Sequence, residues 1–320
     1  MTRKRAGLVG LFGAALLLLA VEPAAAQTSS SVTERLIWEL NGNLLYVAVP
    51  ITVLVEGILI YTVWRFARSD EAKPTQENRR LEITWTVATA VILLFVGVAS
   101  YQVVGNPFVT ASAQVEQPEQ VEQVDVIGQK YLWTFEYTFD AEGVSANGLT
   151  LDGVDVEGAR VVNDTADGAV VAGGQLSGPT LTSATLESGV VAGVNASEGE
   201  TVSLSDVTVS DANVTDATIT NATVTNSNTM VVPTERRLRL NVTSRDVLHS
   251  FHVPGLGLKA DAFPAQSNYL VTRITETGTY QLYCAEYCGV GHSNMLGTVE
   301  AVPQEEYRQW LVDKWASAQS

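Results

Sequence analysis

The segment Cys284-Ala-Glu-Tyr-Cys288-Gly-Val-Gly-His292-Ser-Asn-Met295 contains both cysteines of the chain, and another histidine, His249, stands upstream in Asp246-Val-Leu-His-Ser-Phe251. Thiolate and thioether are soft ligands and imidazole binds copper well, whereas magnesium, calcium and manganese prefer oxygen ligands. Two thiolates four residues apart can each bridge a pair of copper ions. The two histidines would then cap the ends, with Met295 and a backbone carbonyl as weak ligands. The pattern is typical of a binuclear, mixed-valence copper centre.

Two other interpretations of the cysteine pair remain open. An exported protein with two cysteines commonly joins them in a disulfide. A disulfide, however, requires neither a histidine four residues later nor a second histidine segment upstream. Two cysteines and two histidines could also bind zinc, but Cys-x2–4-Cys followed by His-x3–5-His, the usual combination, is absent. The complete set of soft ligands therefore favours copper over both.

The N-terminal third of the chain predicts export and membrane insertion. Residues 1–26 combine a basic start, an apolar run and a small-residue end at Ala24-Ala-Ala26, which are the parts of a cleavable signal peptide. Apolar runs at about 44–66 and 83–104 each have the roughly 20 residues that a membrane-spanning helix needs. Residues 27–104 are therefore predicted to form a transmembrane hairpin. Glu56, inside the first run, is expected to face a partner subunit or a polar crevice.

Charge predicts the orientation of this hairpin. Basic residues gather at the loop between the two runs, residues 67–82, and short basic loops stay in the cytoplasm. They are Arg65, Arg68, Lys73, Arg79 and Arg80. The mature N-terminus and everything beyond residue 104 are then extracytoplasmic. That outer part has 27 acidic and 10 basic residues, which excludes nucleic acid as a partner. Scarce lysine with abundant acidic residues also suggests a halophilic source.

Beyond the hairpin, the sequence predicts a β-rich domain interrupted by repeats. Alternating apolar and aromatic residues at 121–140, 236–242 and 268–282 indicate strands of a Greek-key sandwich. We assign this domain to residues 105–143 and 231–302, and a C-terminal helix to residues 303–320. The intervening segment, residues 144–230, repeats every five residues, as in Val207-Thr-Val-Ser-Asp211 and Ala212-Asn-Val-Thr-Asp216.

The five-residue period resembles that of pentapeptide-repeat proteins, in which two of every five side chains point inward. This resemblance implies an inserted right-handed β-helix of about four coils. Low sequence complexity offers a disordered segment as the alternative. Apolar residues nevertheless keep one phase from Leu149 through Val191, which solvated linkers do not show.

Several segments together resemble subunit II of the haem-copper respiratory oxidases, the cytochrome c oxidase family. They are Glu82-Ile-Thr-Trp-Thr86, Trp133-Thr-Phe-Glu-Tyr137, residues 246–254, residues 256–264 and the copper segment. The resemblance implies a cupredoxin-like sandwich that carries a binuclear CuA centre. It implies the following copper ligands, of which Glu286 would use only its main-chain carbonyl: His249, Cys284, Glu286, Cys288, His292 and Met295.

The same resemblance implies further roles. The Glu286 carboxylate would help to hold magnesium at the contact with subunit I, and Glu82 would lie at the mouth of a proton channel of subunit I. Tyr131 and Trp133 would lie where electrons from the donor are accepted. Tyr131-Leu132 replaces the family's usual Trp-Tyr pair, which leaves the donor open between cytochrome c and a small blue-copper protein. Ala265-Gln266 likewise replaces a common Gly-Arg pair. His252 matches no ligand and is expected to be structural.

We therefore expect a multi-pass membrane subunit of a terminal oxidase that takes electrons from an external donor and passes them to haem in subunit I. Oxygen would be reduced in subunit I, so the chain would take part in the enzyme without containing the catalytic site. A free-standing membrane-anchored copper carrier and a non-redox, quinol-oxidase-type assembly subunit are the alternatives. A nitrous-oxide reductase domain is disfavoured by the hairpin and by Glu82.

Overall fold

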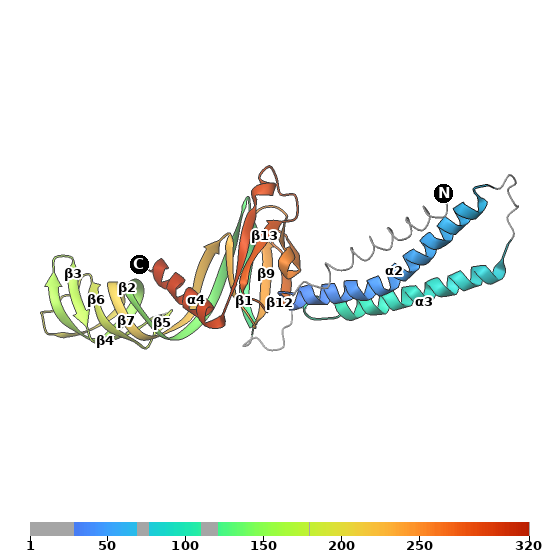
Figure 1. Cartoon of the computed structure of the whole chain (residues 1–320). Coiled ribbons are helices and arrows are strands. Elements are labelled where there is room, and N and C mark those ends of the chain that lie inside the picture. Colours follow the sequence, from blue (N-terminus) through green and yellow to red (C-terminus); the bar gives the residue numbers. More distant parts are fainter. Residues whose placement is uncertain (1–28, 69–76, 110–120, 179, 320) are drawn as a thin grey trace, which may run out of the picture.

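Two long helices lead into a β-domain, which continues into an elongated β-structure on its far side (Figure 1). The computed structural model describes residues 29–68, 77–109, 121–178 and 180–319. The predicted signal peptide, residues 1–26, and most of the basic loop lie outside the described residues. The helices are α2 (Val32–Phe66), α3 (Arg79–Val104) and the C-terminal α4 (Gln304–Ala318).

Helices α2 and α3 are long and apolar enough to cross a membrane, with mean hydropathies of 2.1 and 2.2 in their most apolar windows. Their apolar side chains are largely exposed, as expected for surfaces that face lipid. The expected hairpin is confirmed, but α2 begins twelve residues before the predicted position 44. Ser31 caps the helix, because its side chain accepts a hydrogen bond from the Glu34 N–H at 3.0 Å. The Ser31-Val-Thr-Glu34 signature of this cap was visible in the sequence.

The first turn of α2 packs against the β-domain. The Thr33 Oγ1 lies 2.9 Å from the Thr272 Oγ1 and donates to the Phe108 carbonyl at 3.1 Å. The Ser31 hydroxyl donates to the Leu256 carbonyl at 2.7 Å. These contacts fix this end of the hairpin to the β-domain.

The β-domain is a sandwich of two sheets. One sheet contains the strand order β12-β9-β1-β2, and the other has the order β11-β10-β13-β14-β8. Strand pairs β1–β9 and β14–β8 are parallel, while the other pairs within these two sheets are antiparallel. The strand bounds are β1 (Val121–Gln129), β2 (Leu132–Thr165), β8 (Thr229–Pro233), β9 (Arg237–Ser244), β10 (His249–Val253), β11 (Leu258–Ala262), β12 (Asn268–Arg273), β13 (Gly278–Cys284) and β14 (Leu296–Val302).

Aromatic residues at alternating positions of β2 form the centre of the sandwich core. Trp133, Phe135 and Tyr137 are fully buried, because side chains two residues apart point to the same face of a strand. Tyr137 packs edge-on against Trp310 of α4, with ring centroids 5.1 Å apart. The predicted sandwich and the predicted C-terminal helix are both confirmed.

The inserted segment is built from antiparallel strands, so the predicted right-handed β-helix, whose coils would pair in parallel, is wrong. Strand β2 pairs with β7, β7 with β6, β6 with β3, and β3 with β2, which closes a narrow tube. The remaining strands are β3 (Gly168–Ala172), β4 (Gly174–Ser177), β5 (Leu181–Thr182), β6 (Ala184–Val191) and β7 (Thr201–Ser227).

The five-residue period is nevertheless real and appears as regular bulges. The pairing of β2 with β7 shifts at every repeat, and one residue of each repeat has a positive φ. On β2 these residues are Gly143, Gly148, Gly153 and Gly158, and on β7 they are Asp206, Asp211, Asp216 and Asn221. Glycine, aspartate and asparagine tolerate this conformation best. Two side chains per repeat point into the tube as predicted, including the buried Leu149, Leu151, Val156 and Val161.

We predict that the tube can be removed without loss of copper binding. Strands β2 and β7 run from the sandwich into the tube without a break, and residues 134–139 pair with residues 222–227. Replacing residues 140–221 by Asn-Gly keeps these pairs and closes them with a two-residue hairpin turn. The shortened chain should bind the same amount of copper as the full chain, measured by metal analysis and the visible spectrum. Loss of copper from a chain that retains its β-structure would contradict this expectation.

Candidate metal centre

The pairing of β10 with β13 brings the upstream histidine to the cysteine segment. Phe251 lies opposite Cys284 in this antiparallel pair. The Cys284 N–H donates to the Met295 carbonyl at 3.1 Å, and the Ala285 N–H donates to the Ser250 carbonyl at 2.8 Å. These bonds close the loop between β13 and β14 into a compact structure beside β10. A short 3-10 helix, η4 (His292–Asn294), forms its last turn.

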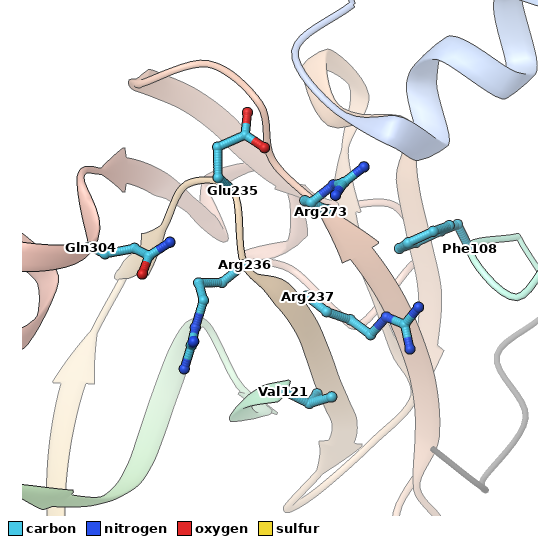
Figure 2. A pocket seen from close by; sticks show the side chains of 7 residues that line it. All are labelled: Phe108, Val121, Glu235, Arg236, Arg237, Arg273 and Gln304. Carbon is cyan, nitrogen blue, oxygen red and sulfur yellow. The ribbon is translucent and has the colours of Figure 1, made fainter. Parts of the chain in front are cut away.

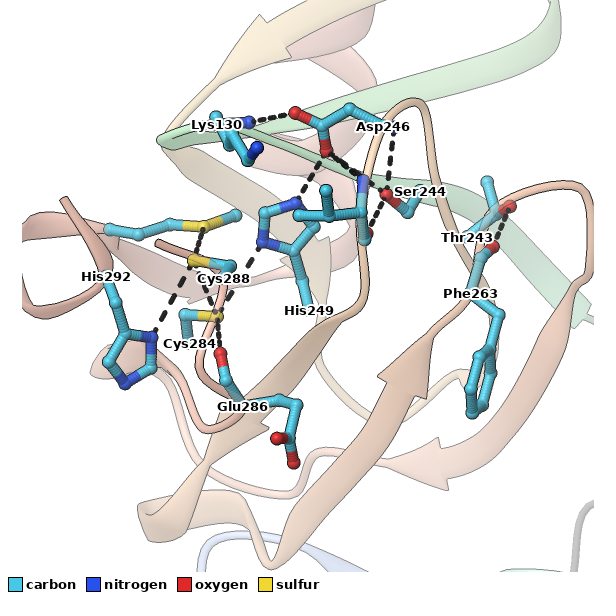
Figure 3. Close-up of polar contacts among 12 residues, drawn as sticks. Lys130, Thr243, Ser244, Asp246, His249, Phe263, Cys284, Glu286, Cys288 and His292 are labelled. Atoms are coloured by element: carbon cyan, nitrogen blue, oxygen red, sulfur yellow. Dashed lines mark hydrogen bonds and ion pairs between the residues drawn. The ribbon is translucent and has the colours of Figure 1, made fainter. Parts of the chain in front are cut away.

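Six potential ligand atoms converge in this loop (Figure 3). The sulfur atoms of Cys284 and Cys288 lie 3.9 Å apart, and both cysteines are free thiols. The remaining contacts are Cys284 Sγ with His249 Nδ1 at 3.8 Å and with the Glu286 carbonyl oxygen at 3.2 Å, and Cys288 Sγ with His292 Nδ1 at 3.7 Å and with Met295 Sδ at 3.8 Å. All predicted copper ligands are therefore brought together.

Burial and proximity disfavour thiolates at this site unless a cation is bound. Burial, followed by the neighbouring Cys284, raises the pKa of the Cys288 thiol to about 11. Metal binding must therefore displace protons from sulfur, as in other thiolate sites. Buried thiols, imidazoles and a thioether within contact distance fit copper by donor chemistry. His249, Cys284 and Cys288 alone place three ligand atoms within 4.8 Å of one another.

Asp246 holds the His249 imidazole in place. Its Oδ1 lies 2.8 Å from His249 Nε2, so Nδ1 is the nitrogen that faces Cys284. Partial burial alone would raise the pKa of Asp246. Hydrogen bonds from His249 and from the N–H groups of Lys130 and Val247 outweigh burial and lower this pKa to about 2. The carboxylate is thus ionised at neutral pH and can orient the ligand.

Residues of β1 and β2 pack against the same imidazole. A Cβ atom at Gly128 would lie 3.0 Å from His249 Cδ2, so a larger residue at this position would press against the imidazole. The Trp133 ring lies edge-on to His249, with centroids 6.1 Å apart. Trp133 is fully buried, and the expectation that it is part of the surface that contacts the donor is corrected. Its phase with Phe135 and Tyr137 in the sequence already indicated a core position.

Tyr131 is partly exposed and lies over the metal loop. A Cβ atom at Gly291 would come within 2.5 Å of the Tyr131 ring, and one at Gly289 within 2.6 Å of its hydroxyl. The ring therefore rests directly on the backbone of the loop that carries Cys288 and His292. Two neighbours missing from the sequence-based prediction, Tyr287 and Val290, are 74% and 96% exposed. In the sequence, their position between predicted copper ligands was the signal that could have placed them beside the metal centre.

The other predicted residues lie outside this cluster. The Glu286 side chain is exposed and points away from the cysteines (Figure 3). Glu82 lies in the first turn of α3, and Glu56 is exposed on α2. His252 is half-buried and contacts no sulfur of the described loop. Burial, followed by the charge of Lys259, lowers its pKa.

Comparison with known proteins identifies the same two regions. Residues 22–103 match the family model described as cytochrome C oxidase subunit II, transmembrane domain, and residues 194–302 match that of its periplasmic domain. Cytochrome c oxidase subunit 2 of Cereibacter sphaeroides is 29% identical over 286 residues, which cover 89% of this chain and 77% of that protein. The corresponding protein of Arabidopsis thaliana is 26% identical and covers 85% and 82% of the two chains.

Among solved structures, the periplasmic domain of subunit II of cytochrome oxidase from Bradyrhizobium japonicum aligns with 65% of this chain and 100% of that one. The sequence identity is 18% and the TM-score is 0.34.

We predict that Asp246→Asn weakens copper binding. An amide cannot supply the negative charge that orients His249, and loss of such outer contacts typically lowers metal affinity by about 10–100-fold. Competition with a copper chelator measures the change. Glu136→Gln serves as the control, because Glu136 forms an ion pair on the surface with Arg245 at 2.7 Å and contacts no ligand. Equal affinities of the two variants would show that Asp246 does not support the site.

Proposed function

Because the chain belongs to the cytochrome c oxidase subunit II family, we propose that it accepts electrons singly from an external donor and passes them to haem in subunit I. It is a subunit of an oxidoreductase complex, and oxygen reduction takes place in the partner subunit. The observation that carries this proposal is the convergence of two free thiols, 3.9 Å apart, with two imidazoles and a thioether. A pair of bound copper ions would supply a one-electron centre whose charge is shared across the two thiolates.

Each side chain has a distinct part in such a site. Cys284 and Cys288 would bridge the metals, since their sulfur atoms face each other at the centre of the cluster. His249 and the Glu286 carbonyl contact Cys284, whereas His292 and Met295 contact Cys288. Each cysteine sulfur is thus contacted by one imidazole and one weak ligand. This near-symmetry favours equal sharing of the electron.

Burial supports rapid electron transfer. His249 and Met295 are fully buried, and both cysteines are less than a tenth exposed. The Cys284 and Ala285 N–H groups donate to the carbonyls of Met295 and Ser250, which holds the ends of the loop, so the ligands need little movement when the charge changes. His292 is only half-buried and lies nearer the surface, beside Tyr287, with ring centroids 5.9 Å apart. We propose that electrons arrive from this side, across Tyr131.

The orientation in the membrane follows from the same proposal. With the basic residues Arg79 and Arg80 in the cytoplasm, the metal centre lies on the outer side, where it can meet a cytochrome c or a small blue-copper protein. Glu82, in the first turn of α3, then lies at the cytoplasmic surface and is available to a proton channel of subunit I. The outward-facing Glu286 carboxylate is available for magnesium at the contact between the subunits.

Two substitutions test the metal centre. The purified chain should bind two coppers that share one unpaired electron, seen as a delocalised signal in electron paramagnetic resonance. Cys288→Ser should abolish this shared state, since one bridging thiolate is lost. Met295→Leu should retain both metals and shift the reduction potential, because a weak ligand tunes a site more than it holds it. A single blue-copper signal, or zinc alone, in the parent chain would refute the binuclear assignment.

A third substitution tests where electrons are accepted. Tyr131→Ala should slow reduction by the natural donor by about tenfold or more, because it removes the ring between the surface and the loop, while the copper spectrum stays nearly unchanged. Stopped-flow reduction measures the rate. Tyr269→Ala, on β12, is the matched control, since that aromatic lies away from the metal loop and packs under Arg239. Equal reduction rates for Tyr131→Ala and the parent would place the accepting surface elsewhere.

A further inference from the structure

A cavity of about 470 Å³ opens at the end of β9 and β12, near the outer end of the transmembrane hairpin (Figure 2). It lies away from the metal centre, because β9 begins at the cavity with Arg237 and ends at Ser244, close to Asp246 and His249. Three arginines contribute to its wall. The lining residues are Phe108, Val121, Glu235, Arg236, Arg237, Arg273 and Gln304.

Two of these arginines are directly opposite each other. Arg237 of β9 pairs with Arg273 of β12 in the antiparallel register, so their side chains leave the same face of the sheet. Like charges in directly opposite positions destabilise a sheet. Within the described residues neither forms an ion pair with a carboxylate, and the Arg273 Nε is buried without a hydrogen-bond partner. Glu235 also lines the cavity, but no carboxylate of the described residues lies within ion-pair distance of either guanidinium.

The neighbouring groups leave this pair available to a ligand. Arg236 is engaged elsewhere, because its Nη2 lies 3.1 Å from the Glu122 Oε1. The Arg237 guanidinium lies over the Phe108 ring at 5.4 Å, which orients it without neutralising its charge. Figure 2 shows Arg236 turned away from Arg237 and Arg273.

The local charge contrasts with the rest of the outer domain. Beyond residue 104 the chain has 27 acidic and only 10 basic residues, and four of the basic ones lie on β9, β12 and the residue before β9. They are Arg236, Arg237, Arg239 and Arg273. A concentration of guanidinium groups on an otherwise acidic domain indicates a specific site for an anion.

The position of the cavity indicates the kind of anion. Helix α3 ends at Val104, and Phe108 follows within one further turn, held by the hydrogen bond from Thr33 to its carbonyl. A residue so close to the end of a membrane-spanning helix lies at the level of the lipid headgroups. Aromatic residues are enriched at this level, and arginines near it attract anionic lipids.

We propose that the phosphate group of an anionic membrane lipid binds between Arg237 and Arg273, with Phe108 beside it. A phosphate would neutralise the opposed pair and accept hydrogen bonds from guanidinium groups that line the cavity. Guanidinium groups suit this role, since their planar donors match phosphate oxygens. The bound lipid would fasten the β-domain to the membrane surface at a second point, beside the attachment that α2 provides.

Native mass spectrometry of the full chain, hairpin included, tests the proposal at low ionic strength. The protein is purified in detergent and mixed with equal amounts of phosphatidylglycerol and phosphatidylcholine. The parent chain should retain phosphatidylglycerol preferentially, and Arg237→Gln/Arg273→Gln should reduce this retention by at least about tenfold. Arg160→Gln/Arg308→Gln, two exposed positions with the same total change in charge, should retain it like the parent.

Three outcomes would overturn the proposal. The first is equal retention of phosphatidylglycerol by the two double variants. The second is displacement of the lipid by inorganic phosphate at the same concentration, which would make free phosphate the ligand. The third is unchanged lipid retention in Arg237→Gln/Arg273→Gln together with loss of subunit I when the oxidase complex that carries this variant is purified, which would assign the arginines to a protein contact. An unchanged copper spectrum confirms that each variant is folded.

Discussion

The antiparallel pairing of β10 with β13 is the constraint on which the metal centre depends. His249 stands 35 residues before Cys284, and only this pairing brings its imidazole to 3.8 Å from the cysteine sulfur. The rest of the ligand set lies within one loop and is nearly local. Strand β2 completes the arrangement, because Trp133 packs against both His249 and Phe251 in the core beneath the site. Copper chemistry in this chain therefore rests on the packing of the whole sandwich.

The same strand also joins the metal domain to the tube. Strand β2 contributes its first residues to the sandwich core and the remainder to the tube, and β7 returns along it. The five-residue bulges give both strands a continuous inner row of small and branched side chains. That row contains no candidate metal ligand. The tube therefore contributes no side chain to the candidate copper site, although its strands continue directly from the sandwich.

The proposed function and the proposed lipid site together give the β-domain two attachments to the membrane with different physical bases. The first is the chain connection through α2, whose start is held against the domain by hydrogen bonds. These bonds join Ser31 to the Leu256 carbonyl and Thr33 to Thr272. The second is the arginine cavity on β9 and β12, which is electrostatic. Both attachments lie at the end of the domain nearest α3, and the metal loop lies at the opposite end. Together they would restrain the distance between the metal loop and the membrane.

The sequence alone was sufficient for the two apolar helices, the sandwich, the C-terminal helix and the choice of candidate ligand residues that the fold brings together. These follow from residue chemistry and from apolar runs or alternation over short distances, which depend little on distant parts of the chain. Sequence also predicted the five-residue period and its inward positions. It could not decide how the repeats wind, because two inward side chains per five residues suit parallel coils and bulged antiparallel strands equally. Only pairing between residues such as Leu149 and Ala212, far apart in the chain, made that choice. The exposure of Tyr287 and Val290 and the opposition of Arg237 to Arg273 were likewise decided by tertiary structure, since each depends on which segment lies alongside and in which register.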